Sequence, residues 1–257
     1  MKLTLIQADQ VWKDPAANRS RVERLVMSQD ETDLIVLPEM FATGFVTEPE
    51  GVAESDDSES LGLMKKLAAA RNCAVAGSLA IRETATGAYR NRFYFVKPDG
   101  SVQYYDKHHL FTHSGEHLRY SPGKERVIVE YKGIRILLQV CYDLRFPVFA
   151  RNKAVGEGAD YDLILYVASW PVQRIEAWDT LLRARAIENQ CYVAGVNRVG
   201  EDPGNKYCGH STFIDPYGKI ISICKENEVD SVTCEIDPAL LVSFRKAFPV
   251  LQDADLH

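Results

Sequence analysis

The sequence predicts an α/β protein with mixed sheets, and three observations support this expectation. Short apolar runs alternate with helical patterns along the whole chain, which is typical of packed α and β layers. Turn signals at 98–100, 131–133 and 215–218 each join two strand-like runs into a hairpin, so some strands are antiparallel. The 257 residues, 46% of them hydrophobic, are enough for one large core, and no linker or internal repeat is visible. We therefore expect a single domain over residues 1–257.

Strands are expected where a short apolar or β-branched run is bounded by turn residues. About twelve runs fit this description: 3–8, 33–38, 73–81, 92–96, 102–105, 126–129, 134–140, 162–168, 192–196, 211–214, 220–223 and 231–236. Helical patterns cover 16–28, 58–71, 147–156, 174–190 and 238–246. In the fourth of these, one apolar face is expected to lie on a sheet, and it consists of Ile175, Trp178, Leu182 and Ile187.

The composition excludes several classes of partner. The net charge is −6 and no block of Lys or Arg stands out, which argues against nucleic acid and anionic membranes and leaves small molecules or proteins. The six cysteines, at 73, 141, 191, 208, 224 and 234, show no CxxC spacing, which indicates a reducing compartment. The opening MKLTLIQADQVW is too short and polar for a signal peptide, and no run approaches the length of a membrane span. We predict a cytoplasmic protein.

The stretch LLQVCYDLRFP is the strongest indication of a catalytic site. The run 134–140 is typical of a buried strand and Pro147 is well placed to open a helix, so Cys141 is expected at a strand-to-helix turn. A helix N-terminus and nearby cations lower the pKa of a thiol, and the thiolate is the nucleophilic form. Cys141 is therefore a candidate nucleophile, and a buried core cysteine is the alternative.

Two further charged residues stand where a strand ends. Glu39 directly follows DLIVLP and is either a structural acid or a general base. Lys107 lies just past the run 102–105, in YYDKHHLF, and is either a surface lysine or a catalytic cation. Catalytic groups collect at strand ends in α/β folds, so both residues are candidates for the same site as Cys141.

Together these contexts resemble a known family. LPEMFATGF around Glu39, YYDKHHLF around Lys107 and VCYDLRFP around Cys141 are similar to the Glu, Lys, Cys triad of the nitrilase superfamily of carbon-nitrogen hydrolases. LLRARAIENQCYV, NRVG and GHSTFIDPYG follow in the family's order, so the resemblance runs from about residue 3 to residue 236. LYVASWP and the short C-terminal tail FPVLQDAD resemble the bacterial YafV-type omega-amidase branch. The resemblance implies a four-layer αββα sandwich that forms a homodimer.

The resemblance also implies a role for each matching residue. Cys141 would attack an amide carbonyl while Glu39 accepts its proton. Lys107 and the backbone N–H of Tyr142 would hold the oxyanion. Glu116, in HSGEHLRYSPG, matches a second family glutamate that positions Lys107 or the substrate.

Four more residues are candidates for the substrate pocket. Arg145 is expected either to pair with a substrate carboxylate or to brace the turn at Asp143, and bracing is the favoured alternative. Phe45, Phe111 and Trp170 follow triad or strand-end segments and are expected to line the pocket, although such aromatics are more often simple core.

The omega-amidase branch implies ammonia release, through a thioester, from small dicarboxylate monoamides such as 2-oxoglutaramate or 2-oxosuccinamate. Other triad enzymes, such as N-carbamoyl amidases and nitrilases, stay open as alternatives, as does a non-catalytic binding protein of the same fold. A zinc hydrolase is a further alternative, because His109, His113 and His117 recur every four residues. Ser114 and Gly115 interrupt that helix pattern, so we expect no metal ion and no cofactor.

Overall fold

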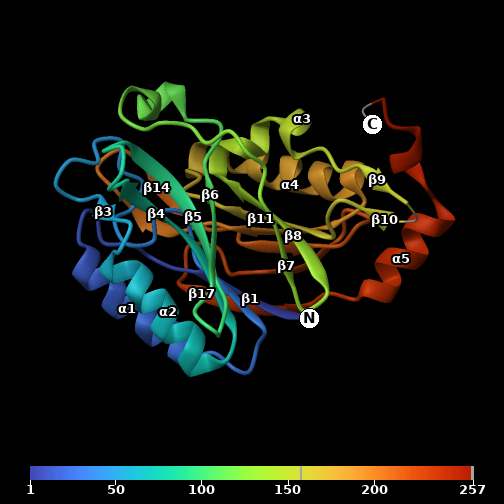
Figure 1. Cartoon of the computed structure of the whole chain (residues 1–257), viewed down its shortest axis with the longest axis horizontal. Coiled ribbons are helices and arrows are strands. Elements are labelled where there is room, and N and C mark those ends of the chain that lie inside the picture. Colours follow the sequence, from blue (N-terminus) through green and yellow to red (C-terminus); the bar gives the residue numbers. More distant parts are fainter. Residues whose placement is uncertain (157, 256–257) are drawn as a thin grey trace.

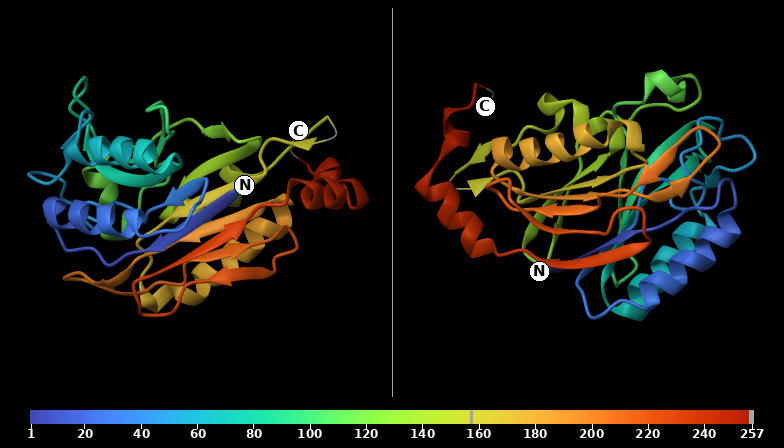
Figure 2. Two further views of the ribbon diagram at one scale, coloured as in Figure 1. Left: turned by 90° about the horizontal axis from the view of Figure 1, so that it is seen from below. Right: turned by 180° about the vertical axis from the view of Figure 1, so that it is seen from behind.

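The structure is a computed structural model of the chain and describes residues 1–156 and 158–255. Two large mixed sheets pack face to face, and helices cover their outer faces (Figures 1 and 2). In order, the layers are α1 with α2, the first sheet, the second sheet, and α4. The expected four-layer αββα sandwich is therefore confirmed. No helix among the described residues is long and apolar enough to cross a membrane.

The first sheet has the strand order β17-β1-β2-β4-β5-β6, with β3 added beside β4. Strands β1, β2 and β4 run parallel, whereas β17, β5 and β6 pair antiparallel with their neighbours. The bounds are β1 Lys2–Gln7, β2 Leu34–Val36, β3 Glu54–Ser55, β4 Ala74–Arg82, β5 Tyr89–Val96, β6 Val102–Asp106 and β17 Asp230–Glu235.

The second sheet has the strand order β16-β15-β12-β11-β8-β7. Its centre is parallel, because β11 pairs parallel with both β8 and β12. The bounds are β7 Ile128–Tyr131, β8 Ile134–Val140, β11 Leu163–Val167, β12 Tyr192–Val196, β15 Thr212–Ile214 and β16 Ile220–Ile223. Two small antiparallel pairs lie outside the large sheets: β9 Ala154–Val155 with β10 Gly158–Ala159, and β13 Val199–Glu201 with β14 Lys206–Cys208.

The helices begin where the sequence supplies caps. Asp14 accepts a hydrogen bond from Ala17 N at the start of α1, and Ser58 accepts one from Leu61 N at the start of α2, which satisfies backbone donors that have no partner in the helix. The bounds are α1 Pro15–Met27, α2 Glu59–Arg71, α3 Pro147–Ala150, α4 Ile175–Asn189 and α5 Pro238–Ala247. Helix α5 extends beyond the end of the sandwich (Figure 1).

Strand alternation divides the core into layers. Leu5 and Val36 of the first sheet meet Leu138 and Leu165 of the second in the central layer. Their chain neighbours point outward, so that Ile6 and Ile35 contact α1 and α2. On the far side, Leu137 and Ile164 contact α4 through Trp178 and Leu182. Because successive side chains of a strand point to opposite faces of the sheet, each strand contributes both to the core between the sheets and to the contacts with the helices.

Two expected details are wrong. The helix expected over 147–156 ends at Ala150, because the buried Asn152 side chain donates to the backbone of Tyr161 and Asn189 and takes the chain into β9. In α4, Trp178 and Leu182 are buried as expected, but Ile187 is 53% exposed. All the expected strands are present, with β5 beginning three residues earlier, at Tyr89. The short strands β3, β9, β10, β13 and β14 carry too few residues to give a period in the sequence.

Candidate active site

Three charged residues form a fully buried cluster at the ends of strands in the first sheet. Glu39 follows β2, Lys107 follows β6, and Glu116 lies in a short 3₁₀ helix, Glu116–Leu118. Lys107 Nζ donates to Glu39 Oε1 at 3.1 Å and to Glu116 Oε2 at 2.9 Å. None of the three side chains is exposed to solvent. The structure therefore brings together three of the four expected catalytic residues in one ion cluster.

Neutral donors complete the cluster, and none of them was a candidate for this role from the sequence. Asn91 Nδ2, from β5, donates to Glu39 Oε1 at 2.7 Å and to Glu116 Oε1 at 3.2 Å. The backbone N–H of Ser169 donates to Glu39 Oε2 at 2.8 Å, and Phe111 N–H donates to Glu116 Oε2 at 2.6 Å. Both carboxylates are thus held in fixed orientations, which buried charges require.

Burial and mutual charge shift the titration of this cluster. Burial alone would lower the pKa of Lys107, but Glu116 and Glu39 outweigh it and hold that pKa above its ordinary value. Burial, together with the charge of Glu39, raises the pKa of the Glu116 carboxyl despite the attraction of Lys107. Lys107 is therefore a permanent cation across the neutral range.

Cys141 stands directly after β8, at the start of the 3₁₀ helix Cys141–Arg145. Its φ of 46° is left-handed, a conformation that is costly for a side chain larger than glycine and is often found at functional sites. The buried carboxylate of Asp143 holds this turn, and it accepts hydrogen bonds from Tyr105 Oη, the backbone N–H of Val140, and both the backbone N–H and the Nδ1 of His109. The expected strand-to-turn placement of Cys141 agrees with the structure.

The expectation of a lowered thiol pKa is wrong. Burial and the negative charge of Glu39 raise the pKa of Cys141 well above its ordinary value, and the opposing effect of Lys107 is smaller. The sequence could not show that the negative charge of Glu39 acts on the thiol more strongly than the positive charge of Lys107 does. Cys141 therefore rests as a thiol, and it needs a base at the moment of attack.

A cavity of about 350 Å³ opens onto Cys141. All five residues expected at the substrate line it: Phe45, Phe111, Tyr142, Arg145 and Trp170. The hairpin of β13 and β14 contributes Asp202, Pro203, Gly204, Asn205 and Tyr207, none of which was a sequence candidate. Tyr142 is the second residue of its 3₁₀ helix, so its backbone N–H has no acceptor within the helix.

Two guanidinium groups face this cavity. Arg145 lies over the ring of Trp170, 5.0 Å from its centre, and does not brace Asp143, so the favoured alternative was wrong. Arg174, which the sequence did not single out, lies 5.3 Å from the centre of the Phe111 ring. In residues 1–156 and 158–255, neither guanidinium forms an ion pair with a carboxylate.

The three histidines spaced by four do not lie on one helix. Gly115, with a left-handed φ of 81°, separates two 3₁₀ turns, Thr112–Ser114 and Glu116–Leu118. His109 is bound to Asp143 and stacks on Phe146, with the ring centres 3.9 Å apart. Among the described residues, these histidines do not form a group close enough to share a metal ion. The zinc alternative therefore loses its geometric basis at this position.

The fold is that of a hydrolase that acts on carbon-nitrogen bonds. A model of the carbon-nitrogen hydrolase family matches residues 2–246, and the chain belongs to that family. Solved structures agree with this assignment. One is a CN-hydrolase superfamily protein from Xanthomonas campestris with an arsenic adduct in its active site. It is 44% identical to this chain with a TM-score of 0.95, and the match covers 100% of this chain and 98% of that one. A Saccharomyces cerevisiae member of branch 10 of the nitrilase superfamily is 26% identical with a TM-score of 0.85, covering 97% and 94%.

Two curated relatives carry more specific names. The Omega-amidase YafV of Escherichia coli (strain K12) is 46% identical over 256 residues, which cover 99% of this chain and 97% of that protein. A 2-oxoglutaramate amidase of Bacillus subtilis (strain 168) is 35% identical over 98% of each chain. Similarity thus extends over nearly the whole length of both.

Proposed function

We propose that this protein is an omega-amidase that releases ammonia from the distal amide of small dicarboxylate monoamides such as 2-oxoglutaramate or 2-oxosuccinamate. The observation that carries the proposal is the cavity, in which Arg145 and Arg174 share one space with Cys141. A guanidinium pairs with a carboxylate in bidentate geometry, so either arginine can hold one end of the substrate while the amide reaches the thiol. The names of the relatives at 46% and 35% identity support the same reaction.

The chemistry begins with the thiol. Cys141 sulfur bonds to the amide carbon while its proton passes to Glu39, whose Oε2 is held in place by Ser169 N–H at 2.8 Å. The raised pKa of Cys141 means that proton transfer accompanies attack instead of preceding it. Glu39, Lys107 and Cys141 thus act as a base, a cation and a nucleophile.

The carbonyl oxygen becomes negative as the sulfur–carbon bond forms. Lys107 Nζ and the backbone N–H of Tyr142 are the donors that stabilise this oxyanion. Glu116 positions Lys107 by pairing with it at 2.9 Å, while Glu39 Oε1 lies 3.1 Å from the same ammonium. The ammonium is thereby fixed before the reaction starts, which is the condition for strong electrostatic stabilisation.

The intermediate then collapses to a thioester. The carbon–nitrogen bond breaks, and the proton on Glu39 goes to the departing nitrogen, which leaves as ammonia. Water attacks the thioester and gives a proton to Glu39; the carbon–sulfur bond breaks, and that proton returns to the Cys141 sulfur. The product is the dicarboxylate, and the enzyme is restored without a cofactor.

A comparison of kcat/KM tests this proposal. We expect fast ammonia release from 2-oxoglutaramate, much slower release from glutamine and simple aliphatic amides, and little action on nitriles. Arg174→Gln or Arg145→Gln should lower kcat/KM for 2-oxoglutaramate by about tenfold or more, because the substrate carboxylate loses a charge-assisted, bidentate partner. The same changes should have little effect on a neutral amide. Arg119→Gln, on the 53% exposed Arg119, is the matched control. A nitrile or an N-carbamoyl amino acid as best substrate would refute the omega-amidase assignment.

The proposal extends to assembly and location. Strand β16 is an edge strand with Ile221 48% exposed, and Val242 of α5 is 65% exposed, so both offer apolar surface to a second copy of the chain. We expect a homodimer, which light scattering after gel filtration tests, and Ile221→Glu with Val242→Glu should yield monomers.

All six cysteines are free thiols, which supports the cytoplasm as the compartment.

A further inference from the structure

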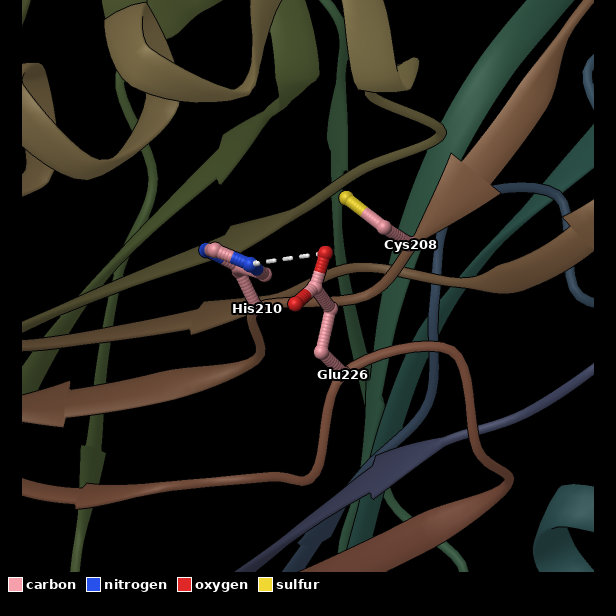
Figure 3. Close-up of side chains that lie close together, drawn as sticks. All are labelled: Cys208, His210 and Glu226. Carbon is pink, nitrogen blue, oxygen red and sulfur yellow. Dashed lines mark ion pairs between the residues drawn. The ribbon is translucent and has the colours of Figure 1, made fainter.

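A second group of reactive side chains lies outside the catalytic cluster, at the end of β14. Cys208, His210 and Glu226 each offer one ligand atom, and these atoms lie within 4.8 Å of one another (Figure 3). His210 Nε2 is 3.9 Å from Glu226 Oε1. Among the residues that the structure describes, this is the one group of three such side chains close enough to hold an ion together.

The donor set matches one kind of ligand. A thiolate, an imidazole and a carboxylate are the three ligand types that zinc accepts, at bond lengths of about 2.0–2.3 Å. Tetrahedral ligand atoms at those lengths are about 3.3–3.8 Å apart, so the observed spread closes with a shift of about 1 Å. Glu226, whose side chain is 61% exposed, has room for that shift. We propose that Cys208, His210 and Glu226 bind Zn²⁺, with a water molecule as the fourth ligand.

Asp179 prepares the histidine for this role. Its Oδ2 lies 2.8 Å from His210 Nδ1, so the proton of the neutral ring is held on Nδ1 and the lone pair of Nε2 is available on the side of Cys208 and Glu226. A carboxylate behind the histidine is the usual partner of a zinc-bound imidazole and increases its basicity. Asp179 comes from α4, an element that the ligands themselves do not share.

The backbone that carries the ligands is held from several sides. Gln7 is fully buried and joins the two segments, because its Nε2 donates to Lys225 O and Glu228 O while its Oε1 accepts from Ser211 N. Gly209 fits tightly against this side chain, since a Cβ there would lie 2.2 Å from Gln7 Cδ. These contacts hold the turn of Glu226 beside the strand end of Cys208.

His210 itself has a strained backbone. Its φ is 63°, in the left-handed region, and its carbonyl accepts a hydrogen bond from Trp178 Nε1 at 3.0 Å. Such a conformation persists only where the surroundings enforce it, and it is frequent at binding sites. Asn227 N–H also donates to Cys208 O at 2.9 Å, which fixes the two ligand-bearing segments at a constant distance.

Zinc at this position would act on the substrate cavity. Cys208 is the last residue of β14, and its neighbour Tyr207 lines the cavity from the opposite face of the strand. The loop between β13 and β14 supplies a further part of that wall, through residues 202–205. A metal that fixes Cys208 therefore fixes the hairpin, and we expect it to influence KM and leave kcat unchanged, because no catalytic step uses a Lewis acid.

The test is a metal titration of the full-length chain with Cys141→Ala, since the catalytic thiol is itself a soft ligand. Calorimetry with Zn²⁺ should give one site per chain, and Co²⁺ should produce a thiolate-to-cobalt charge-transfer absorption. Adding Cys208→Ala should remove that absorption, and Cys208→Ala or His210→Ala should each weaken Zn²⁺ binding by at least about 100-fold. Adding Asp179→Asn should weaken binding by about 10- to 100-fold and retain the absorption.

Matched controls change the same residue types elsewhere. Cys73→Ala and His117→Ala, which lie outside the group, should leave both signals as they are. If Cys208→Ala does not fold, Cys208→Ser provides the same comparison. Absence of a stoichiometric site, or an unchanged absorption in the Cys208 variants, would overturn the proposal. Binding is measured without substrate, so a failure of the omega-amidase assignment would leave this test intact.

The kinetic arm uses the unmodified enzyme. After dialysis against a strong chelator, kcat should be unchanged and KM should rise, and added Zn²⁺ should restore the original KM. If KM is the same with and without zinc, the inferred link between the site and the cavity wall is wrong.

Discussion

Replacing Lys107 by methionine tests whether the buried cation serves catalysis, folding or both. Lys107 pairs with two carboxylates, at 3.1 Å to Glu39 and 2.9 Å to Glu116, and all three side chains are fully buried. Loss of an oxyanion donor is worth about 2.7–4 kcal/mol, so kcat should fall by about 10²- to 10³-fold. Removing one partner of a buried ion pair costs about 3–5 kcal/mol of stability, because the other charges stay behind.

The double variant Lys107→Met/Glu116→Gln separates the two effects. It leaves Glu39 as the one carboxylate, still bound by Asn91 and the backbone of Ser169, so much of the lost stability should return. The oxyanion donor is still missing, so kcat should stay low. Lys66→Met, on an exposed lysine paired with Glu23, is the matched control and should change neither quantity.

The pH dependence of stability gives a second readout. The pKa of Glu116 is raised already in the wild type, and removal of Lys107 should raise it further. A raised carboxyl pKa favours the folded state below the unfolded value of about 4.3 and loses that contribution as pH rises. The deficit of Lys107→Met, measured by urea unfolding, should therefore be largest near neutral pH and smallest near pH 4. A kcat within threefold of wild type, or recovery of kcat in the double variant, would refute the assigned role.

Three further predictions concern the thiols and the base. Cys141→Ala should abolish ammonia release and keep the fold. In the wild type, iodoacetamide should modify Cys141 first, because the other five cysteines are buried. Earlier labelling of Cys208, together with an active Cys141→Ala enzyme, would contradict this prediction. Glu39→Gln should lower kcat by about a hundredfold or more, and a loss of threefold or less would remove Glu39 from the mechanism. Burial raises the pKa of Cys73 to about 11, whereas the thiol of the unfolded chain has a pKa of about 8.5. Between these two pH values the folded state holds a proton that the unfolded state has lost. The free energy of unfolding therefore falls as pH rises through this range. Cys73→Ala should reduce that fall by up to about 1.4 kcal/mol per pH unit, and equal slopes in urea unfolding would disprove it.

The sequence predicted the features that depend on local pattern. Apolar runs of four residues or more predicted the strands of both large sheets except the two-residue β3, because alternation and turn residues are local signals. The same runs placed Glu39, Lys107 and Cys141 correctly at strand ends. The helix expected after Pro147 failed because its end depends on Asn152, which bonds to segments 9 and 37 residues further along the chain.

The missed site residues share a different cause. Asn91 and Arg174 have unremarkable neighbours in the sequence, and their importance arises only where separate strands and turns meet. The same holds for Cys208, which ends β14, and for Glu226, which lies in the turn between β16 and β17, because the two carry no metal-binding spacing. The direction of the pKa shift of Cys141 was also a property of the assembled site, since it depends on whether Glu39 or Lys107 acts more strongly on the thiol.

The division of the proposed catalytic groups between the two sheets has a mechanical consequence. Glu39 and Lys107 are attached to one sheet, whereas Cys141 and Ser169 are attached to the other, and the layer that includes Leu5 and Leu165 is the spacer between them. The distance between Glu39 and Cys141, across which the proton would travel, is therefore set by the volume of the side chains in this spacer layer, which does not contact the substrate. A displacement of 1 Å can cost about a hundredfold in rate, far more than its effect on stability. Substitutions in this spacer layer are then constrained by the need to keep Glu39 aligned with Cys141 as much as by the need to keep the protein folded.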